Sequence, residues 1–259
     1  MKATVQGASE SFARTLFTRG TDIFGAREIK DAFGIEISDV PPIPFTEEEL
    51  IAARPRGESL IFQPADVTMK SIYELTGNKT SDGKKLLYDI SGCKNEAFFE
   101  AYRLRYGWRL TSQEVISISR GRGYLGQTQA LANHLKETVF AGIEMVESAT
   151  LAVIEFEKEK QELEILLSND WEEAARRMVA LKINEKFRET PVEVFFRLAL
   201  YERINGVRLL PSKWTWTNVL SSRGDIINLG RFNEYGVSIY GGGSPRDSFG
   251  NPGVCFSRS

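Results

Sequence analysis

The glycine-rich segment Gly121–Gly126 has the residue types and spacing most suggestive of chemistry. It reads G-R-G-Y-L-G, which matches the spacing of a dinucleotide-binding loop, and it lies between a predicted strand at Val115–Ile118 and a predicted helix. The amino terminus of that helix could hold a phosphate. A Rossmann unit also needs a second strand that ends in an acid for the ribose. Glu144 and Glu147 instead lie in a helical pattern, so a turn before a helix is the favoured interpretation.

The remaining reactive residue types do not combine into a catalytic or metal site. His134 is the only histidine, and its place in a helical pattern suits a surface or packing role. Cys93 and Cys255 are too few for a disulfide scaffold and wrongly spaced for zinc, although they could pair. The acidic pairs Glu47–Glu49 and Glu172–Glu173 belong to helix starts, where carboxylates suit the helix dipole. We therefore predict no catalytic residue, no metal site and no cofactor.

The elements that position these residues begin with short helices and a proline cluster. Phe12–Phe33 predicts one or two amphipathic helices, and Asp39–Pro44 is typical of a linker or rigid strap. We place a domain boundary near Pro55. Residues 1–54 are then a helical segment with a proline-rich linker, and residues 55–259 are the main domain.

A long helical region is predicted at about residues 127–205. Leu131, Leu135 and Val139 fall on one helical face, and the apolar spacing continues beyond them. Asn169, three residues before Glu172, is expected to cap a second helix. Thr190-Pro191-Val192-Glu193 is a fuller start signal, and Asn205-Gly206 is a stop signal.

The composition is that of an ordinary folded protein. The chain has 259 residues, of which 42% are hydrophobic and 26% charged, enough to bury a substantial core. Its 33 Lys and Arg nearly cancel its 35 Asp and Glu, so no basic field recruits nucleic acid. Residues 1–6 lack the apolar segment of a signal peptide, and no run is long enough to span a bilayer. We expect a cytoplasmic protein, or one in a phage or cell-surface particle.

The tail at about residues 228–259 has the composition of a binding surface. It is rich in Gly, Ser, Asn, Asp, Arg and Tyr, which paratopes favour, because Tyr offers rigid amphipathic area and small polar residues offer adaptable hydrogen bonds. Val237 and Ile239 alternate with Ser238 and Tyr240 as in a half-buried strand, and Val254–Phe256 predicts a final strand. These strands argue against a plain glycine-rich coil.

Several short motifs in this part of the chain carry a family resemblance. Leu209–Thr217 contains W-T-W-T, Leu229–Phe232 reads L-G-R-F, and Arg246-Asp247 is followed by Gly253-Val254. Upstream, Gly107–Thr111 reads G-W-R-L-T. These segments resemble the W-x-W-T, R-G-G-S-W, R-x-x-x-x-x-G-F-R and W-R-L-P-T motifs of the formylglycine-generating-enzyme type of C-type lectin fold.

The chain departs from that family in ways that affect its chemistry. Gly230 has no second glycine beside it, and Cys255 and Phe256 replace the usual Phe-Arg. Catalytic members need a pair of cysteines close together late in the chain, and Cys255 has no such neighbour. The resemblance therefore implies the fold without the oxidase activity.

The same fold occurs in the target proteins of diversity-generating retroelements, whose variable region the tail resembles. Adenine-directed variation of an Asn codon cannot produce Lys, Glu, Gln, Met or Trp, and the tail lacks all of these except Glu234, which would be a fixed position. The resemblance implies scaffold roles for Trp214, Trp216, Phe232, Val237, Ile239, Val254 and Phe256. The candidate ligand-contacting residues that it implies are Asn233, Tyr235, Ser238, Tyr240, Ser244, Arg246, Asp247, Ser248 and Asn251.

We therefore predict an α+β protein with a C-type-lectin-like fold and a long helical insertion. Its predicted function is non-enzymatic binding of a macromolecular ligand through a diversifiable surface. Two alternatives stay open. One is a nucleotide-binding protein or enzyme that uses Gly121–Gly126. The other is a structural subunit of a phage or surface assembly, with the helical region as its interface.

Overall fold

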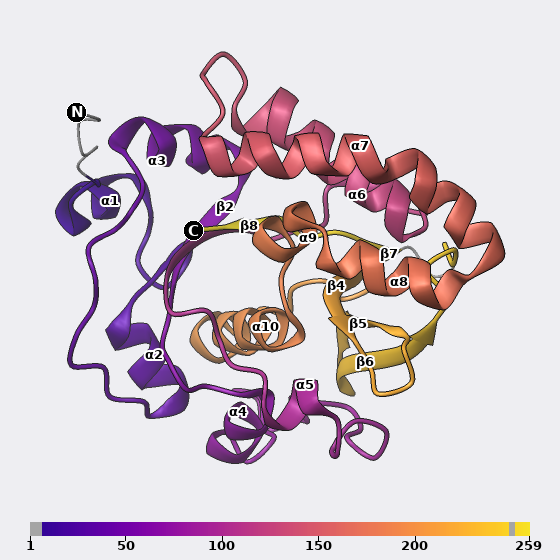
Figure 1. The fold of residues 1–259 in the computed structure, drawn as a ribbon. Coiled ribbons are helices and arrows are strands. Elements are labelled where there is room, and N and C mark those ends of the chain that lie inside the picture. Colours follow the sequence, from indigo (N-terminus) through magenta and orange to yellow (C-terminus); the bar gives the residue numbers. More distant parts are fainter. Residues whose placement is uncertain (1–6, 249–251) are drawn as a thin grey trace.

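The computed structural model describes residues 7–248 and 252–259, and it confirms the α+β class. Two four-stranded sheets and a set of helices make up the described chain (Figure 1). The C-type-lectin-like assignment remains a prediction.

The first sheet joins segments from both ends of the chain, in the order β1-β2-β3-β8. β1 (Ile23–Phe24) runs parallel to β2 (Glu58–Gln63), whereas β3 (Gly107–Ser112) is antiparallel to both β2 and β8 (Ser257–Arg258). Every residue of β2 is buried, which explains why its sequence lacks an alternation of apolar and polar residues.

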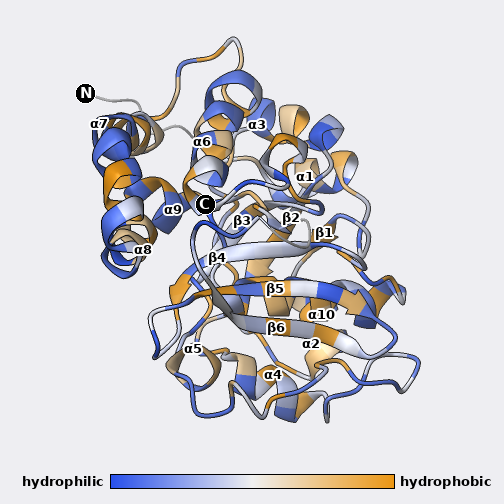
Figure 2. Ribbon diagram, turned by 90° about the vertical axis from the view of Figure 1, so that its right-hand side faces the viewer, coloured by the Kyte–Doolittle hydropathy of each residue, from blue (hydrophilic) through white to orange (hydrophobic). Residues whose placement is uncertain are grey.

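The second sheet has the order β6-β5-β4-β7 and contains all the strands of the predicted tail except β8. β4 (Trp214–Leu220) and β5 (Ile226–Asn233) are antiparallel, as are β5 and β6 (Gly236–Gly243). β7 (Pro252–Gly253) runs parallel to β4. Figure 2 shows β4, β5 and β6 side by side, with α10 behind them. β6 is therefore an edge strand.

Helix α10 (Pro191–Asn205) is the central element of the main core. Residues 191–202 are all buried, so the helix has no solvated face. The predicted start and stop are confirmed: Thr190 and Glu193 form a capping box, and Gly206 ends the helix in the left-handed conformation. The short helices α4 (Met69–Leu75) and α5 (Ala97–Glu100) pack against it.

The hydrophobic core crosses the position predicted as a domain boundary near Pro55. The Phe24 ring lies 5.0 Å from the Tyr201 ring, and the Phe33 ring lies 5.3 Å from the Phe196 ring, measured between centroids. One cluster of buried side chains thus joins the N-terminal part of the described chain to α10. The helices of that part are α1 (Glu10–Leu16), α2 (Ala26–Phe33) and α3 (Glu47–Ala53).

A helical layer covers one end of the two sheets and encloses a second core. Tyr124, Phe156, Trp216 and Phe256 are buried in this core. Its helices are α6 (Tyr124–His134), which continues as a π-helical turn at Leu135–Val139, α7 (Glu147–Asn169), α8 (Trp171–Ala180) and α9 (Lys182–Phe187). None of the helices in the described residues combines the length and apolar composition needed to cross a bilayer.

The strand predicted at Val115–Ile118 is wrong. Val115 and Ile116 lie outside regular secondary structure, and Ser117–Ser119 forms a 3-10 helix. The Ile116 N–H donates to the Val254 carbonyl at 2.9 Å, and the Val254 N–H donates to Ser119 Oγ at 3.0 Å. These bonds to a distant part of the chain replace a regular strand ladder.

Two further local predictions are wrong in detail. Asn169 is the last residue of α7, and the cap of α8 is Asp170, whose Oδ1 accepts from the Glu173 N–H at 3.0 Å. Val254–Phe256 is not itself a strand, because this fully buried segment carries the chain from β7 in one sheet to β8 in the other.

His134 packs into the fold, as one of its two predicted roles required. Its ring lies edge-on to Phe256, with centroids 5.3 Å apart. Burial, together with the nearby Arg56 cation, lowers the pKa of His134 to about 4.

This pKa predicts a pH-dependent contribution to stability. The pKa of an unfolded histidine is about 6.5, so the unfolded state binds the proton more readily than the folded state. The contribution is fully present above pH 6.5 and is lost as the pH falls towards 4. We expect the free energy of unfolding of wild-type protein minus that of His134→Gln to decrease over this window in urea titrations. A constant difference would contradict the burial argument, because the carboxylates titrate alike in both proteins.

Candidate functional site

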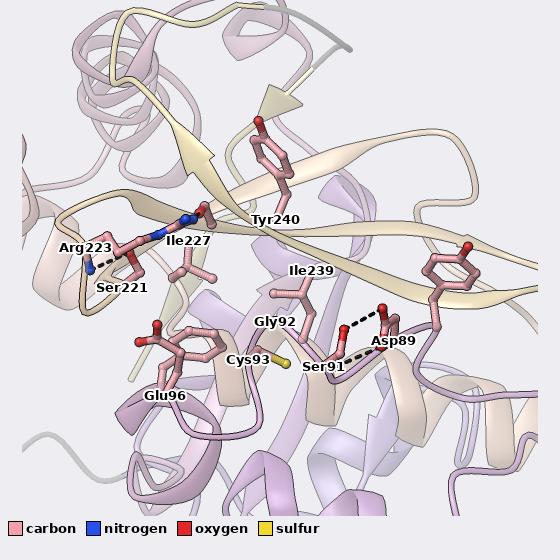
Figure 3. Close-up of a pocket in the computed structure, with 13 residues that line it drawn as sticks. Asp89, Ser91, Gly92, Cys93, Glu96, Ser221, Arg223, Ile227, Ile239 and Tyr240 are labelled. Atoms are coloured by element: carbon pink, nitrogen blue, oxygen red, sulfur yellow. Dashed lines mark hydrogen bonds between the residues drawn. The ribbon is translucent and has the colours of Figure 1, made fainter.

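Strand β6 presents side chains to two different environments. Val237 is fully buried, whereas Tyr240 is 53% exposed. Figure 3 shows Ile239 and Tyr240 on opposite sides of the strand. Ser238 lies two residues before Tyr240, and strand alternation puts it on the same side. The side of β6 that carries Ser238 and Tyr240 is called the outward side below.

The structure brings part of the predicted contact set together around this outward side. Tyr235 is 61% exposed in the turn between β5 and β6, and its N–H donates to Asn233 Oδ1 at 3.0 Å. Asn233 is half-buried and shapes this turn, as an Asx turn does. Asn251 lies outside the described residues.

The loop at residues 244–248 is held by its own polar groups. The Ser244 N–H donates to Asp247 Oδ2 at 2.9 Å, and the Asp247 N–H donates to the Ser244 carbonyl at 2.8 Å. Arg246 donates to the Leu167 carbonyl in the last turn of α7. Ser244 and Asp247 are half-buried and stabilise the loop, whereas Ser248 is exposed.

The glycine-rich motif makes contact with this same loop. The Tyr124 N–H at the start of α6 donates to the Pro245 carbonyl at 2.7 Å. A Cβ atom on Gly123 would lie 2.8 Å from that carbonyl oxygen, so only glycine allows the loop to approach. The loop therefore covers the helix terminus that a phosphate would need, and the structure offers no support for the nucleotide-binding alternative at Gly121–Gly126.

Two glycines of the tail are also required by packing. Gly230 has φ +149°, and an added Cβ would lie 2.1 Å from the Lys213 carbonyl oxygen. At Gly236 an added Cβ would lie 2.8 Å from the Tyr88 nitrogen. These two glycines contribute to the binding-surface composition of the tail, but their role in the fold is to allow close backbone crossings.

A groove of about 570 Å³ runs along the edge of β6. Its walls come from three segments that are distant in sequence: residues 88–98, residues 221–227, and residues 239–241. In Figure 3, Ile239 and Ile227 point into the groove from the sheet, with Cys93 opposite. This groove was missed by sequence reasoning, although the pair Asp89 and Ser91 is a recognisable local turn signal.

The charged groups among the described residues that line the groove are two carboxylates and one guanidinium. Asp89 accepts from the N–H and Oγ of Ser91 at 2.8 and 2.9 Å, and these hydrogen bonds hold its pKa below the usual range. Glu96 accepts from the N–H and Oγ of Ser222 at 2.8 and 2.7 Å. Arg223 donates to the Gly241 carbonyl at 2.5 Å. Both carboxylates are thus fixed in place by serine donors.

The thiol in the groove is not an activated nucleophile. Cys93 is buried and free, and burial raises its pKa to about 11, with further contributions from Asp89 and Glu96. Nucleophilic cysteines have lowered pKa values. Cys255 is also free and fully buried, so the two cysteines do not pair. The described residues contain no group of three His, Cys, Asp or Glu side chains that could hold a metal ion.

Comparison of the chain with protein-family models, with curated proteins and with solved structures finds no match.

The raised pKa of Cys93 predicts slow alkylation. At pH 8 we expect native protein to react with iodoacetamide at least tenfold more slowly than urea-unfolded protein, because a thiol with a pKa of about 11 holds little thiolate. Mass spectrometry of the modified peptides would measure this. In the Cys93→Ser variant, any remaining alkylation comes from Cys255. Rapid alkylation of Cys93 in the native protein would contradict its raised pKa.

Proposed function

We propose that this chain is a non-enzymatic binding protein, that its ligand is a macromolecule, and that it contacts this ligand through the outward side of β6 and the adjoining loop. The observation that carries the proposal is the contrast along β6. Tyr240 is 53% exposed, yet Val237 on the same strand and Leu229 on its neighbour are completely buried. An exposed aromatic side chain is thus carried by a strand that is held in place by buried residues.

Fixed loops favour binding, because fewer groups must be ordered when the ligand arrives. Pro245 and Arg246 attach the loop to α6 and α7, and Asp247 closes it internally. The contact set that fits this geometry best is smaller than the one expected from the sequence. It consists of Tyr235, Ser238, Tyr240, Arg246 and Ser248. Ser244 and Asp247 are left out of this set because their hydrogen bonds stabilise the loop.

A C-type-lectin-like scaffold and a retroelement-diversified tail are part of the proposal. In its support, the W-T-W-T and L-G-R-F motifs lie on adjacent strands, with Trp214 opposite Gly230. The G-W-R-L-T motif forms β3, which pairs with Ser257 and Arg258 in β8. Two of the motifs are therefore paired with each other, and a third is paired with the end of the tail.

The nucleotide sequence around the gene tests the diversification directly. We expect a near-copy of the codons for residues 228–259 that differs chiefly at adenines, beside a gene for a reverse transcriptase. Codons for Ser238, Tyr240 and Ser248 should be among those that differ, and codons for Gly230 and Gly236 should not. A genome without such a copy would remove the diversified surface from the proposal and leave a binding surface of fixed sequence.

Mutational tolerance tests the display surface itself. Tyr240→Ser and Ser248→Tyr are expected to change the free energy of unfolding by less than about 1 kcal/mol, because these side chains are exposed. Phe232→Ala, on the buried side, is expected to cost about 3–5 kcal/mol. Urea titrations would measure both. Equal losses at exposed and buried positions would contradict a surface that varies on a fixed scaffold.

A further inference from the structure

The edge of β6 is open beside the groove. The Val237 N–H donates to the Leu86 carbonyl at 2.8 Å, and the Tyr88 N–H donates to the Val237 carbonyl at 2.9 Å. Both backbone groups of Val237 therefore point away from β5. The direction of these groups alternates along a strand, so the N–H and carbonyl of Ile239 point the same way as those of Val237. Within the described chain, the segment around Leu87 pairs with β6 only at Val237. Within the described chain, an extended segment could therefore add to this edge at Ile239, because the Gly241 carbonyl accepts from Arg223.

The groove next to this edge combines an apolar floor with a negative rim. Ile227, Ile239 and Phe98 supply apolar surface, and Asp89 and Glu96 supply the carboxylates. Tyr88, which also lines the groove, is 53% exposed. In Figure 3, Asp89 and Glu96 lie on either side of Ile239 and Cys93. A chain of methylene groups that ends in a cation matches this arrangement.

The charges of the groove are not balanced by its own residues. Arg223 is the one cation among the described residues that line the groove, and it contacts the Gly241 carbonyl and, at 3.5 Å, the Asp225 carboxylate. The hydrogen bonds that hold Asp89 and Glu96 come from neutral serine groups. The lining therefore carries two carboxylates against one guanidinium, which disfavours phosphate and other anionic ligands.

We propose that this groove binds a Lys or Arg side chain from an extended segment of a polypeptide partner that pairs with the edge of β6. The methylene groups lie on Ile227 and Ile239, as the stems of long basic side chains do on apolar surfaces. The cation lies at the negative rim that Asp89 and Glu96 supply. This inference rests on the proposed binding function, and it names the class of partner.

A titration with a short peptide tests the groove by itself. The probe is the capped pentapeptide Val-Thr-Lys-Thr-Val, and the control is the same peptide with norleucine, which keeps the methylene groups and removes the charge. In 15N-resolved spectra of the full chain, we expect the lysine peptide to shift the amides of residues 88–98 and 239–241. The norleucine peptide should bind at least tenfold more weakly.

Two double variants distinguish the effect of the groove carboxylates on peptide affinity from the effect of the protein's overall charge. Asp89→Asn with Glu96→Gln keeps the serine hydrogen bonds, and we expect at least a tenfold loss of affinity for the lysine peptide. The double variant Asp66→Asn with Glu100→Gln removes the same charge from exposed pairs elsewhere, and it should bind like wild-type protein.

Three results would overturn the inference. They are equal binding of the norleucine peptide, unchanged affinity in the Asp89 and Glu96 double variant, and the absence of shifts in the groove at millimolar peptide. None of these would affect the proposed function, because the diversified codons and the mutational tolerance of the outward side are tested separately. Conversely, if the genome has no near-copy of the codons for residues 228–259, the peptide titration still tests the groove.

Discussion

The burial of the Arg188 guanidinium is the constraint that joins the helical layer to the sheets. Arg188 is completely buried, and burial lowers its pKa. Its side chain donates to Asn184 Oδ1 at 3.0 Å, to Thr128 Oγ1 at 3.2 Å and to the Trp216 carbonyl at 3.3 Å. Its cation also lies 3.9 Å from the centre of the Tyr124 ring. A buried charge is tolerated only when such partners surround it, so α6, α9 and β4 must keep their relative positions.

The candidate site depends on that junction. Tyr124, which stacks on Arg188, also donates its N–H to Pro245 and its hydroxyl to the Thr217 carbonyl at 3.0 Å. One residue therefore links the buried cation, strand β4 and the loop that adjoins the outward side of β6. The helical layer thus has a physical role in the site, because it fixes a loop that would otherwise be held only by its internal hydrogen bonds. This rigidity gives the proposed surface its low ordering cost.

Features that depend on neighbouring residues could be predicted from the sequence, and features that depend on distant ones could not. The capping box at Thr190 and the stop at Gly206 are local, and both are present. Val115–Ile118 has strand-like residues, but its hydrogen bonds to Val254 replace the ladder. The groove could not be predicted for the same reason. Its walls join residues 88–98 to residues 221–227 and 239–241, and no periodicity within one segment encodes that meeting.

The composition of the tail has two causes, and the structure separates them. Gly230 and Gly236 allow backbones to cross closely, so their identity is set by the scaffold. Ser238 is half-buried and Tyr240 is exposed on the outward side, where a change of an exposed side chain costs the fold little. If every residue of the tail varied, substitutions at Gly230 and Gly236 would disrupt the close backbone crossings at Lys213 and Tyr88. Variation is compatible with this fold only where it follows the alternation of β6, and the alternation therefore decides which positions can serve recognition.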